Sequence, residues 1–138
     1  MKRFSVLSEL TEAERELLVE LLEERELQAG EALFLEGEES DGLVLVESGA
    51  LRLTSERAGT LGLVSAGGSI GGMALVSVGQ RELSAVAEEA SHVRLLSRSA
   101  FRRLVEDAPR VGCRILETCV VEFAGVVREC LDRMKFRA

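Results

Sequence analysis

The sequence predicts a mainly β domain, an antiparallel sandwich or barrel placed between an N-terminal helix and C-terminal helices. Through about residues 26–96, apolar and polar residues alternate in short runs separated by glycine, which is the pattern of half-buried strands. Both flanks instead repeat apolar residues every three or four positions, as amphipathic helices do. No helix of crossover length separates the alternating runs, so a Rossmann-type parallel sheet is excluded.

The length of the chain predicts one domain, and its hydropathy predicts neither a membrane helix nor a signal peptide. A chain of 138 residues is long enough to bury a core, and we divide it into an N-terminal helical segment (1–25), a strand region (26–96) and C-terminal helices (97–138). It has no apolar run near the roughly 18 to 20 residues of a membrane helix, and its N-terminus turns acidic too early for a signal peptide. We therefore expect a cytoplasmic protein without a membrane partner, and the preference for arginine over lysine fits a bacterial origin.

The first helix is expected at about residues 11–25. Thr11 and Glu14 have the spacing of a capping box, in which each side chain accepts a hydrogen bond from the other residue's backbone N–H at the start of a helix. An apolar face follows at spacings of three and four, formed by Leu17, Leu18, Leu21 and Leu22. Such a helix needs another layer to cover it.

The strand region begins after this helix and contains runs such as "ALFLE", "GLVLVESG" and "ALRLTSE". Glycines separate the runs at intervals of about 7 to 12 residues, at Gly30, Gly37, Gly49, Gly59 and Gly67. Short strands with turn residues at that spacing are typical of antiparallel sandwiches and barrels. Between Ala74 and Gly79 a short helix or turn interrupts the pattern.

The C-terminal segment predicts two helices. Ser97 is placed to cap a short helix that ends near Pro109, and a longer helix runs from about Arg110 to the end. Its apolar residues are spaced 3 and 4 in turn, an a/d seam formed by Cys113, Leu116, Val120, Phe123, Val127, Cys130 and Met134. We expect a homodimer through this helix; the alternative is that the stripe packs on the chain's own strands.

The charge balance argues against direct binding of nucleic acid. Seventeen basic residues face 24 acidic ones, a formal net charge of −7, whereas binding to DNA requires several cations gathered on one surface. The candidate basic cluster is small and is interpreted as a solvated helix face; it consists of Arg94, Arg98, Arg102 and Arg103.

No residue set predicts a metal site or catalysis. Cys113, Cys119 and Cys130 are spaced by 6 and 11 residues, which is not a zinc spacing, and His92 is the one histidine of the sequence. In its strand pattern, His92 is expected to face solvent or to cap a neighbour. No serine or cysteine has an evident base beside it, so we expect no enzyme, no catalytic residues and no metal or other cofactor.

The stretch "GGSIGGMALVSVGQRELSAVA", residues 67–87, points instead to an anion. It has four glycines in six positions, and Arg81 follows a short apolar run. Glycines ahead of a helical turn present backbone N–H groups to a phosphate, and a nearby arginine supplies the opposite charge.

Taken together, the order of elements resembles the cyclic-nucleotide-binding domain, the ligand-sensing β-roll of the catabolite activator protein family and of the regulatory subunits of protein kinase A. The resemblance runs from about Phe4 to Met134 and is carried by "AGEALFLEGEESDGLVLVESGALRL", by "IGGMAL" with an arginine and "SAVA" after it, and by "VRLLSRSAFRRLVEDAPRV". It implies an antiparallel double-stranded β-helix, a jelly-roll-like β-roll. That roll has an N-terminal helix, a short cassette helix, and C-terminal hinge and dimer helices.

The resemblance also implies a ligand site. In that family the short helix offers its N–H groups to a cyclic phosphate, an arginine pairs with the same phosphate, and a glutamate accepts the ribose 2′-hydroxyl. Here the glutamate is replaced by Gly72, a small or hydroxyl residue by Glu82, and the loop is about one residue shorter. The candidate ligand-binding residues are Gly71, Gly72, Met73, Ala74, Arg81 and Glu82.

These departures predict a degenerate pocket. Loss of the carboxylate removes a charge-assisted hydrogen bond, and Glu82 either repels a phosphate or pairs with Arg81. We therefore expect a non-catalytic, dimeric regulatory or scaffold protein that acts through an unidentified protein partner. The alternative is a functional sensor of a cyclic nucleotide or another small anion through Arg81. Because the sequence stops at Ala138, we expect no DNA-binding domain after the dimer helix.

Overall fold

The fold was obtained as a computed structural model, which describes residues 10–137. Three α-helices and a short helical turn accompany the strands of the described residues in the following order: α1 (Glu12–Leu21), β1 (Glu23–Leu27), β2 (Ala32–Phe34), β3 (Gly42–Ser48), β4 (Ala50–Ser55), β5 (Gly59–Ser65), β6 (Ser69–Ile70), the 3₁₀ turn η2 (Gly72–Leu75), β7 (Ser84–Ala87) and β8 (Ser91–Ser97), and then α2 (Arg98–Asp107) and α3 (Pro109–Arg137). This order confirms the predicted fold class.

The strands form two antiparallel sheets of four strands each. One sheet has the order β1-β8-β3-β6 and the other the order β2-β7-β4-β5, so consecutive strands lie in different sheets except for the hairpin of β4 and β5. The inner faces of the two sheets bury one core, formed by Leu27, Phe34, Val44, Val46, Leu51, Ala85, Ala87 and Val93.

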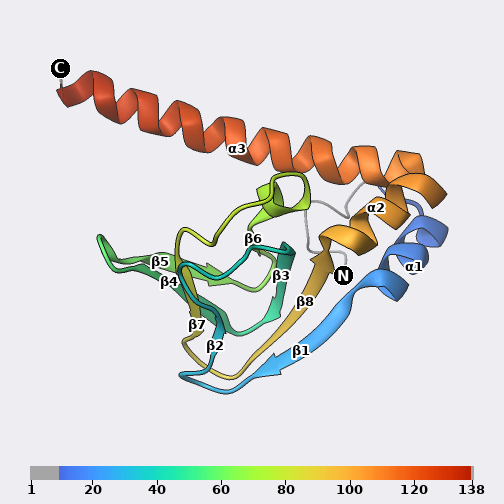
Figure 1. The fold of residues 1–138 in the computed structure, drawn as a ribbon, viewed down its shortest axis with the longest axis horizontal. Coiled ribbons are helices and arrows are strands. Elements are labelled where there is room, and N and C mark those ends of the chain that lie inside the picture. The colour runs from blue at the N-terminus through green and yellow to red at the C-terminus, as the bar shows by residue number, and fades with distance from the viewer. Residues whose placement is uncertain (1–9, 138) are drawn as a thin grey trace.

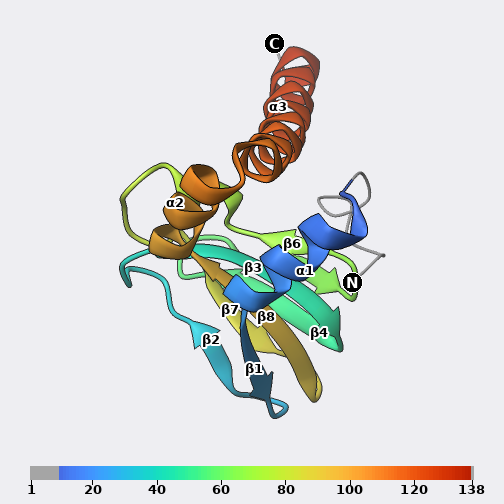
Figure 2. The same cartoon turned by 90° about the vertical axis from the view of Figure 1, so that its right-hand side faces the viewer.

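A second core lies between the first sheet and the helices. Strand β3 serves both cores, because Val44 and Val46 point to one face of the sheet and Leu43 and Leu45 to the other. Burial on both faces explains why "GLVLV" contains a continuous apolar run instead of an alternation. The helices lie together at one end of the roll (Figures 1 and 2), and their core includes Leu18, Leu75, Leu96, Phe101, Leu104, Val111 and Ile115.

The N-terminal helix is capped as predicted but is shorter. The Thr11 backbone N–H donates to Glu14 Oε1 at 2.9 Å, and the Glu14 N–H donates to Thr11 Oγ1 at 3.2 Å. The helix ends at Leu21 and not near residue 25, because residues 23–27 pair with β8 as the edge strand β1. Sheet pairing here overrides the helix propensity of the run "EEREL".

The two C-terminal helices also form where expected. The N–H of Ala100 donates to Ser97 Oγ at 3.1 Å, which caps α2. Pro109 is the first residue of α3, a position where its missing N–H costs nothing. The second half of α3 extends past the roll into solvent (Figure 1). Over the described range, no helix combines the length and apolar character that a membrane span requires.

Candidate functional site

The predicted ligand-binding residues gather in the wall of one cavity. We call residues 69–83, from β6 through η2 to the loop before β7, the cassette segment. A cavity of about 390 Å³ lies between this segment, Phe34 and α3. All six predicted residues line it: Gly71, Gly72, Met73, Ala74, Arg81 and Glu82.

Gly71 shapes the start of the short helix. Its φ of +76° lies in the left-handed region that glycine adopts without strain, and its carbonyl accepts the N–H of Ala74 at 2.9 Å. A Cβ at this position would lie 2.5 Å from Arg81 Nη1. The turn therefore favours glycine at this position, and a side chain here would also displace the end of Arg81.

Arg81 reaches the cassette turn despite the shorter loop. Its Nη2 donates to the Gly42 carbonyl at 3.2 Å, and its guanidinium carbon lies 4.1 Å from the centroid of the Phe34 ring. Two backbone hydrogen bonds fix the residue itself, from Gly37 N–H to the Arg81 carbonyl at 2.8 Å and from Arg81 N–H to the Glu38 carbonyl at 2.6 Å. The backbone N–H and carbonyl of Arg81 are thus both tied to the turn between β2 and β3.

The electrostatic environment of Arg81 is that of a half-buried cation. Burial lowers the pKa of Arg81 from its ordinary value, while Asp41 raises it in part and Arg98 lowers it further. A guanidinium stays charged under these conditions. The cavity therefore keeps one positive charge in its wall.

Glu82 does not neutralise this charge. Within the part of the chain that the structure describes, no carboxylate forms an ion pair with Arg81, and the Glu82 residue is exposed. The predicted alternative of an Arg81–Glu82 pair is therefore wrong. The Gly42 carbonyl and the Phe34 ring take its place, because the guanidinium turns toward the strand layer.

Helix α3 supplies a wall that the sequence did not predict. Cys119, Glu122, Phe123 and Val126 line the cavity from this helix. Their spacing of three and four was the available signal, but the sequence alone does not show that this face of the helix lies over the cassette segment. Only Phe123 was predicted as functional, and it was assigned to the dimer interface.

The contact of α3 with the cassette is closest at Gly72. A Cβ built on Gly72 would lie 2.7 Å from Cys119 Sγ and 3.3 Å from Cys119 Cβ. Burial raises the pKa of the Cys119 thiol, and the neighbouring Glu122 carboxylate adds to this. An uncharged thiol thus packs against the residue that stands where the family resemblance implies a glutamate.

Two members of the predicted basic cluster are used inside the fold. Arg98 donates from Nε to the Ala74 carbonyl at 2.9 Å and from Nη2 to the Ser40 carbonyl at 2.7 Å. Arg94 pairs with Glu24 at 2.8 Å and with Glu47 at 2.7 Å. The cluster is therefore not a solvated helix face. Of its four arginines, only Arg102 and Arg103, on α2, are exposed.

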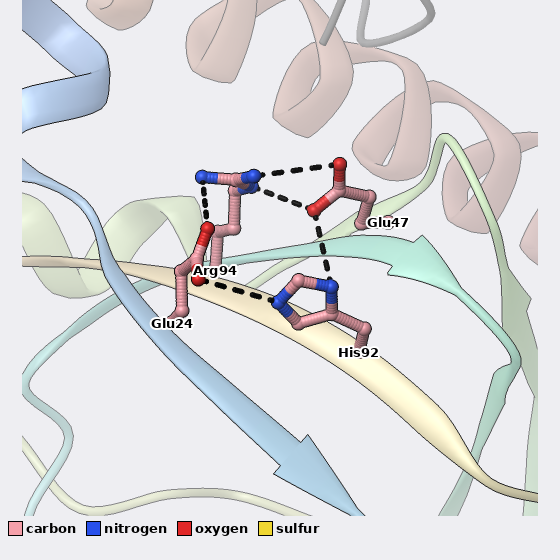
Figure 3. A network of polar contacts seen from close by, with 4 residues as sticks. All are labelled: Glu24, Glu47, His92 and Arg94. Atoms are coloured by element: carbon pink, nitrogen blue, oxygen red, sulfur yellow. Dashed lines mark hydrogen bonds and ion pairs between the residues drawn. The ribbon is translucent and has the colours of Figure 1, made fainter.

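Arg94 belongs to a polar network on the outer face of the first sheet (Figure 3). His92 lies between two carboxylates, with Nδ1 3.4 Å from Glu47 Oε2 and Nε2 3.9 Å from Glu24 Oε2. The hydrogen bond from Arg94 holds the pKa of Glu47 below its ordinary value and raises that of Arg94. The network joins β1, β3 and β8, so His92 binds neighbours rather than facing solvent alone.

The seam residues of α3 divide between the core and the surface. Leu116 is half-buried against the helical core, whereas Val120, Phe123 and Met134 are 60%, 50% and 65% exposed. Cys130 is a free, exposed cysteine, and Val127 is exposed as well. The residues that pack on the domain are Val111, Ile115 and Cys119, on a neighbouring face of the helix.

Comparison with known proteins agrees with this geometry. The family model described as cyclic nucleotide-binding domain matches residues 24–108. The cAMP-dependent protein kinase regulatory subunit of Yarrowia lipolytica is 30% identical over 106 residues, which are 76% of this chain and 28% of that protein. The Cyclic AMP receptor protein of Thermus thermophilus is 31% identical over 116 residues, 81% of this chain and 54% of the relative.

A solved structure gives the same result in three dimensions. The crystal structure of the Thermus thermophilus Catabolite Activator Protein superimposes with a TM-score of 0.82 at 27% identity, covering 95% of this chain and 63% of that one. The chain thus spans less than two thirds of the length of each of these three relatives. By sequence and by fold, the chain belongs to the cyclic nucleotide-binding domain family.

Proposed function

We propose that this chain is a non-catalytic, dimeric regulatory protein whose cassette no longer grips the ribose of a cyclic nucleotide, and that it acts through a protein partner. The observation that carries the proposal is at Gly72. The residue has no side chain to accept a sugar hydroxyl, and Cys119 lies where such a side chain would begin. Relatives with regulatory names support the regulatory part.

The energetic consequence follows from the lost hydrogen bond. A hydrogen bond to a charged group contributes about 1.5 to 3 kcal/mol, so its absence weakens binding by roughly one to two decades. The Glu82 carboxylate in the cavity wall adds a like charge near any phosphate. Arg81 and the Gly71 turn remain, so the phosphate half of the site is kept while the sugar half is gone.

Isothermal titration tests this proposal. The full chain is titrated with cyclic AMP, cyclic GMP and cyclic dinucleotides at ligand concentrations up to about 1 mM, and we expect no heat of binding. Micromolar binding that is abolished by Arg81→Ala and kept by Arg52→Ala would contradict it. Arg52 is a suitable control because its partner is Glu88, on the strand side away from the cavity.

A second candidate function is sensing of a small anion other than a nucleotide. It is favoured by the unneutralised charge of Arg81 in a cavity of about 390 Å³. Titration with inorganic phosphate and sulfate under the same conditions tests it, because binding of such an anion requires Arg81 without requiring a carboxylate at position 72. If no anion gives a heat of binding, the result favours the proposed regulatory protein that acts without a ligand.

The dimer part of the proposal rests on the uncovered seam. Val120, Phe123, Val127 and Met134 repeat at heptad spacing along an exposed helix. Exposed apolar stripes of this kind are rare on a monomer. A second copy fits because Val120, Val127 and Met134 lie exposed beside the face that packs on the roll, with Phe123 at the boundary between the two faces.

The remaining parts of the proposal concern location and nucleic acid. We propose a cytoplasmic location, supported by three free thiols. Direct binding of DNA is disfavoured because Arg94 and Arg98 are engaged within the fold. A gel shift at about 50 mM salt, where charge-driven binding is strongest, is expected to show no complex.

A further inference from the structure

Three contacts tie the cassette segment to the C-terminal helices. At one end, Ser69 Oγ lies 3.4 Å from Glu122 Oε2 of α3. At the other, Arg98 of α2 donates to the Ala74 carbonyl at 2.9 Å. Between them, Gly72 meets Cys119. The first part of the cassette segment, residues 69–74, is therefore held to both helices.

The middle contact is the one that depends on the absence of a side chain. Unlike Gly71, Gly72 does not have a positive φ, so its backbone conformation is open to any residue. What requires glycine is space, because a Cβ would lie 2.7 Å from Cys119 Sγ. Cys119 is short and buried on a helix whose neighbours Val111 and Ile115 are fully packed, so it has little room to withdraw.

We propose that Gly72 and Cys119 form a lock that holds α3 on the cassette, and that a side chain at position 72 and a docked α3 exclude each other. Cys119 acts as a positioning residue, because its contact with Gly72 sets the position of α3. The position of α3 in turn determines which direction the a/d seam on that helix faces. The inference goes beyond the proposed function: it concerns what holds the helix, whatever the cavity binds.

The thiol of Cys119 reports directly on the lock. In a Cys113→Ser/Cys130→Ser background, Cys119 is the one thiol left of the three in the sequence. Its rate of reaction with a disulfide reagent under native conditions measures how often α3 lifts from the cassette. We expect slow reaction in this background, unchanged by 1 mM cyclic AMP, and a rate at least about tenfold higher after Gly72→Ala.

Gly79→Ala is the matched control. Gly79 lies in the same cassette segment, has no positive φ, and a Cβ there meets nothing within 4 Å. We expect its rate to stay within about twofold of the background. An unchanged rate in Gly72→Ala, or a marked change with cyclic AMP in the background protein, overturns the proposal. Titration calorimetry measures ligand binding and therefore tests the proposed function. The effect of Gly72→Ala on the reaction rate of Cys119 tests the lock, so either proposal can be contradicted without the other.

A second variant keeps the test decisive if Gly72→Ala does not fold. Adding Cys119→Ala removes the Sγ atom and leaves a contact of 3.3 Å to the Cβ, which is tight but tolerable. We expect the double variant to recover folding and the hydrogen-exchange protection of residues 111–119 lost in the single variant. A double variant no better than Gly72→Ala overturns the lock as the cause.

Discussion

The two halves of α3 have the same apolar period and opposite surroundings. In the first half, Val111 and Ile115 are 0% and 1% exposed, whereas in the second half Val120 and Met134 are 60% and 65% exposed. The first half lies over α2 and η2, and the second extends beyond the roll (Figure 1). A repeat of apolar residues thus identifies the apolar face of a helix. Whether that face is buried depends on whether the rest of the domain reaches far enough to cover it.

The comparison also separates two adjacent faces of one helix. Ile115, Cys119 and Val126 point to the roll, while Leu116, Val120 and Val127 follow the seam beside it. Because the faces adjoin, Phe123 lines the cavity and belongs to the seam at once. The helix can therefore pack on its own domain and still offer an uncovered stripe.

The largest effect is expected from removing a buried side chain in the first half. Ile115→Ala leaves a cavity in the helical core, where Ile115 is 1% exposed, and should lower the free energy of unfolding by about 2 to 5 kcal/mol. Val121→Ala, at a position 66% exposed in the second half, should change it by less than about 0.5 kcal/mol. Chemical denaturation measures both. Equal losses in the free energy of unfolding for the two variants would mean that both halves of α3 are buried to the same degree.

The next effect tests the second half. Val120→Asp combined with Val127→Asp places two charges in the proposed seam and should weaken dimerisation at least about a hundredfold, or about 2.7 kcal/mol, with little change in the fold of each chain. Light scattering then reports a monomer mass. Val121→Asp, exposed outside the seam, is the control and should leave the mass unchanged. If the double variant keeps the mass of the parent, the stripe is not the interface.

A smaller effect is expected where α2 meets the cassette. Arg98→Met removes the hydrogen bonds to the Ala74 and Ser40 carbonyls and should cost about 1.5 to 3 kcal/mol of stability. Arg102→Met, on the exposed face of the same helix, should cost less than about 0.5 kcal/mol. The difference in thermal midpoint measures the contribution. Similar losses in the two variants would show that Arg98 acts as an ordinary surface residue.

Much of the fold was predictable because local patterns and tertiary packing agree. The capping box of Thr11 and Glu14, the cap at Ser97 and the strand periods all appear in the structure. The exception is β1, where a charged run with helix propensity becomes an edge strand because β8 offers it a partner. Pairing between distant segments leaves no mark in a charged local sequence.

The site was predictable only in part, for a related reason. The cassette residues are contiguous, so a motif identifies them, and the structure brings all six to one cavity. Cys119 and Glu122 come from a helix about 50 residues later and reach the cavity through packing alone. Sequence spacing also could not show that Arg81 turns to Gly42 and Phe34 rather than to its neighbour Glu82.

The smallest effect compares an ion pair on the domain body with one on the second half of α3. Arg94 holds the pKa of Glu47 below its ordinary value in the folded chain, so this carboxylate stabilises the fold above that ordinary value, and its contribution is lost as pH falls through the lowered pKa. Glu47→Gln should therefore cost about 1 kcal/mol or less at pH 7, with a difference from the parent that shrinks in acid below about pH 4.5. Glu129→Gln, which breaks the exposed pair with Arg133, should cost less still at pH 7. Urea denaturation at pH 7 and pH 3.5 measures both, and a Glu47→Gln loss that persists unchanged at pH 3.5 would mean that packing, and not the charge on Glu47, accounts for it.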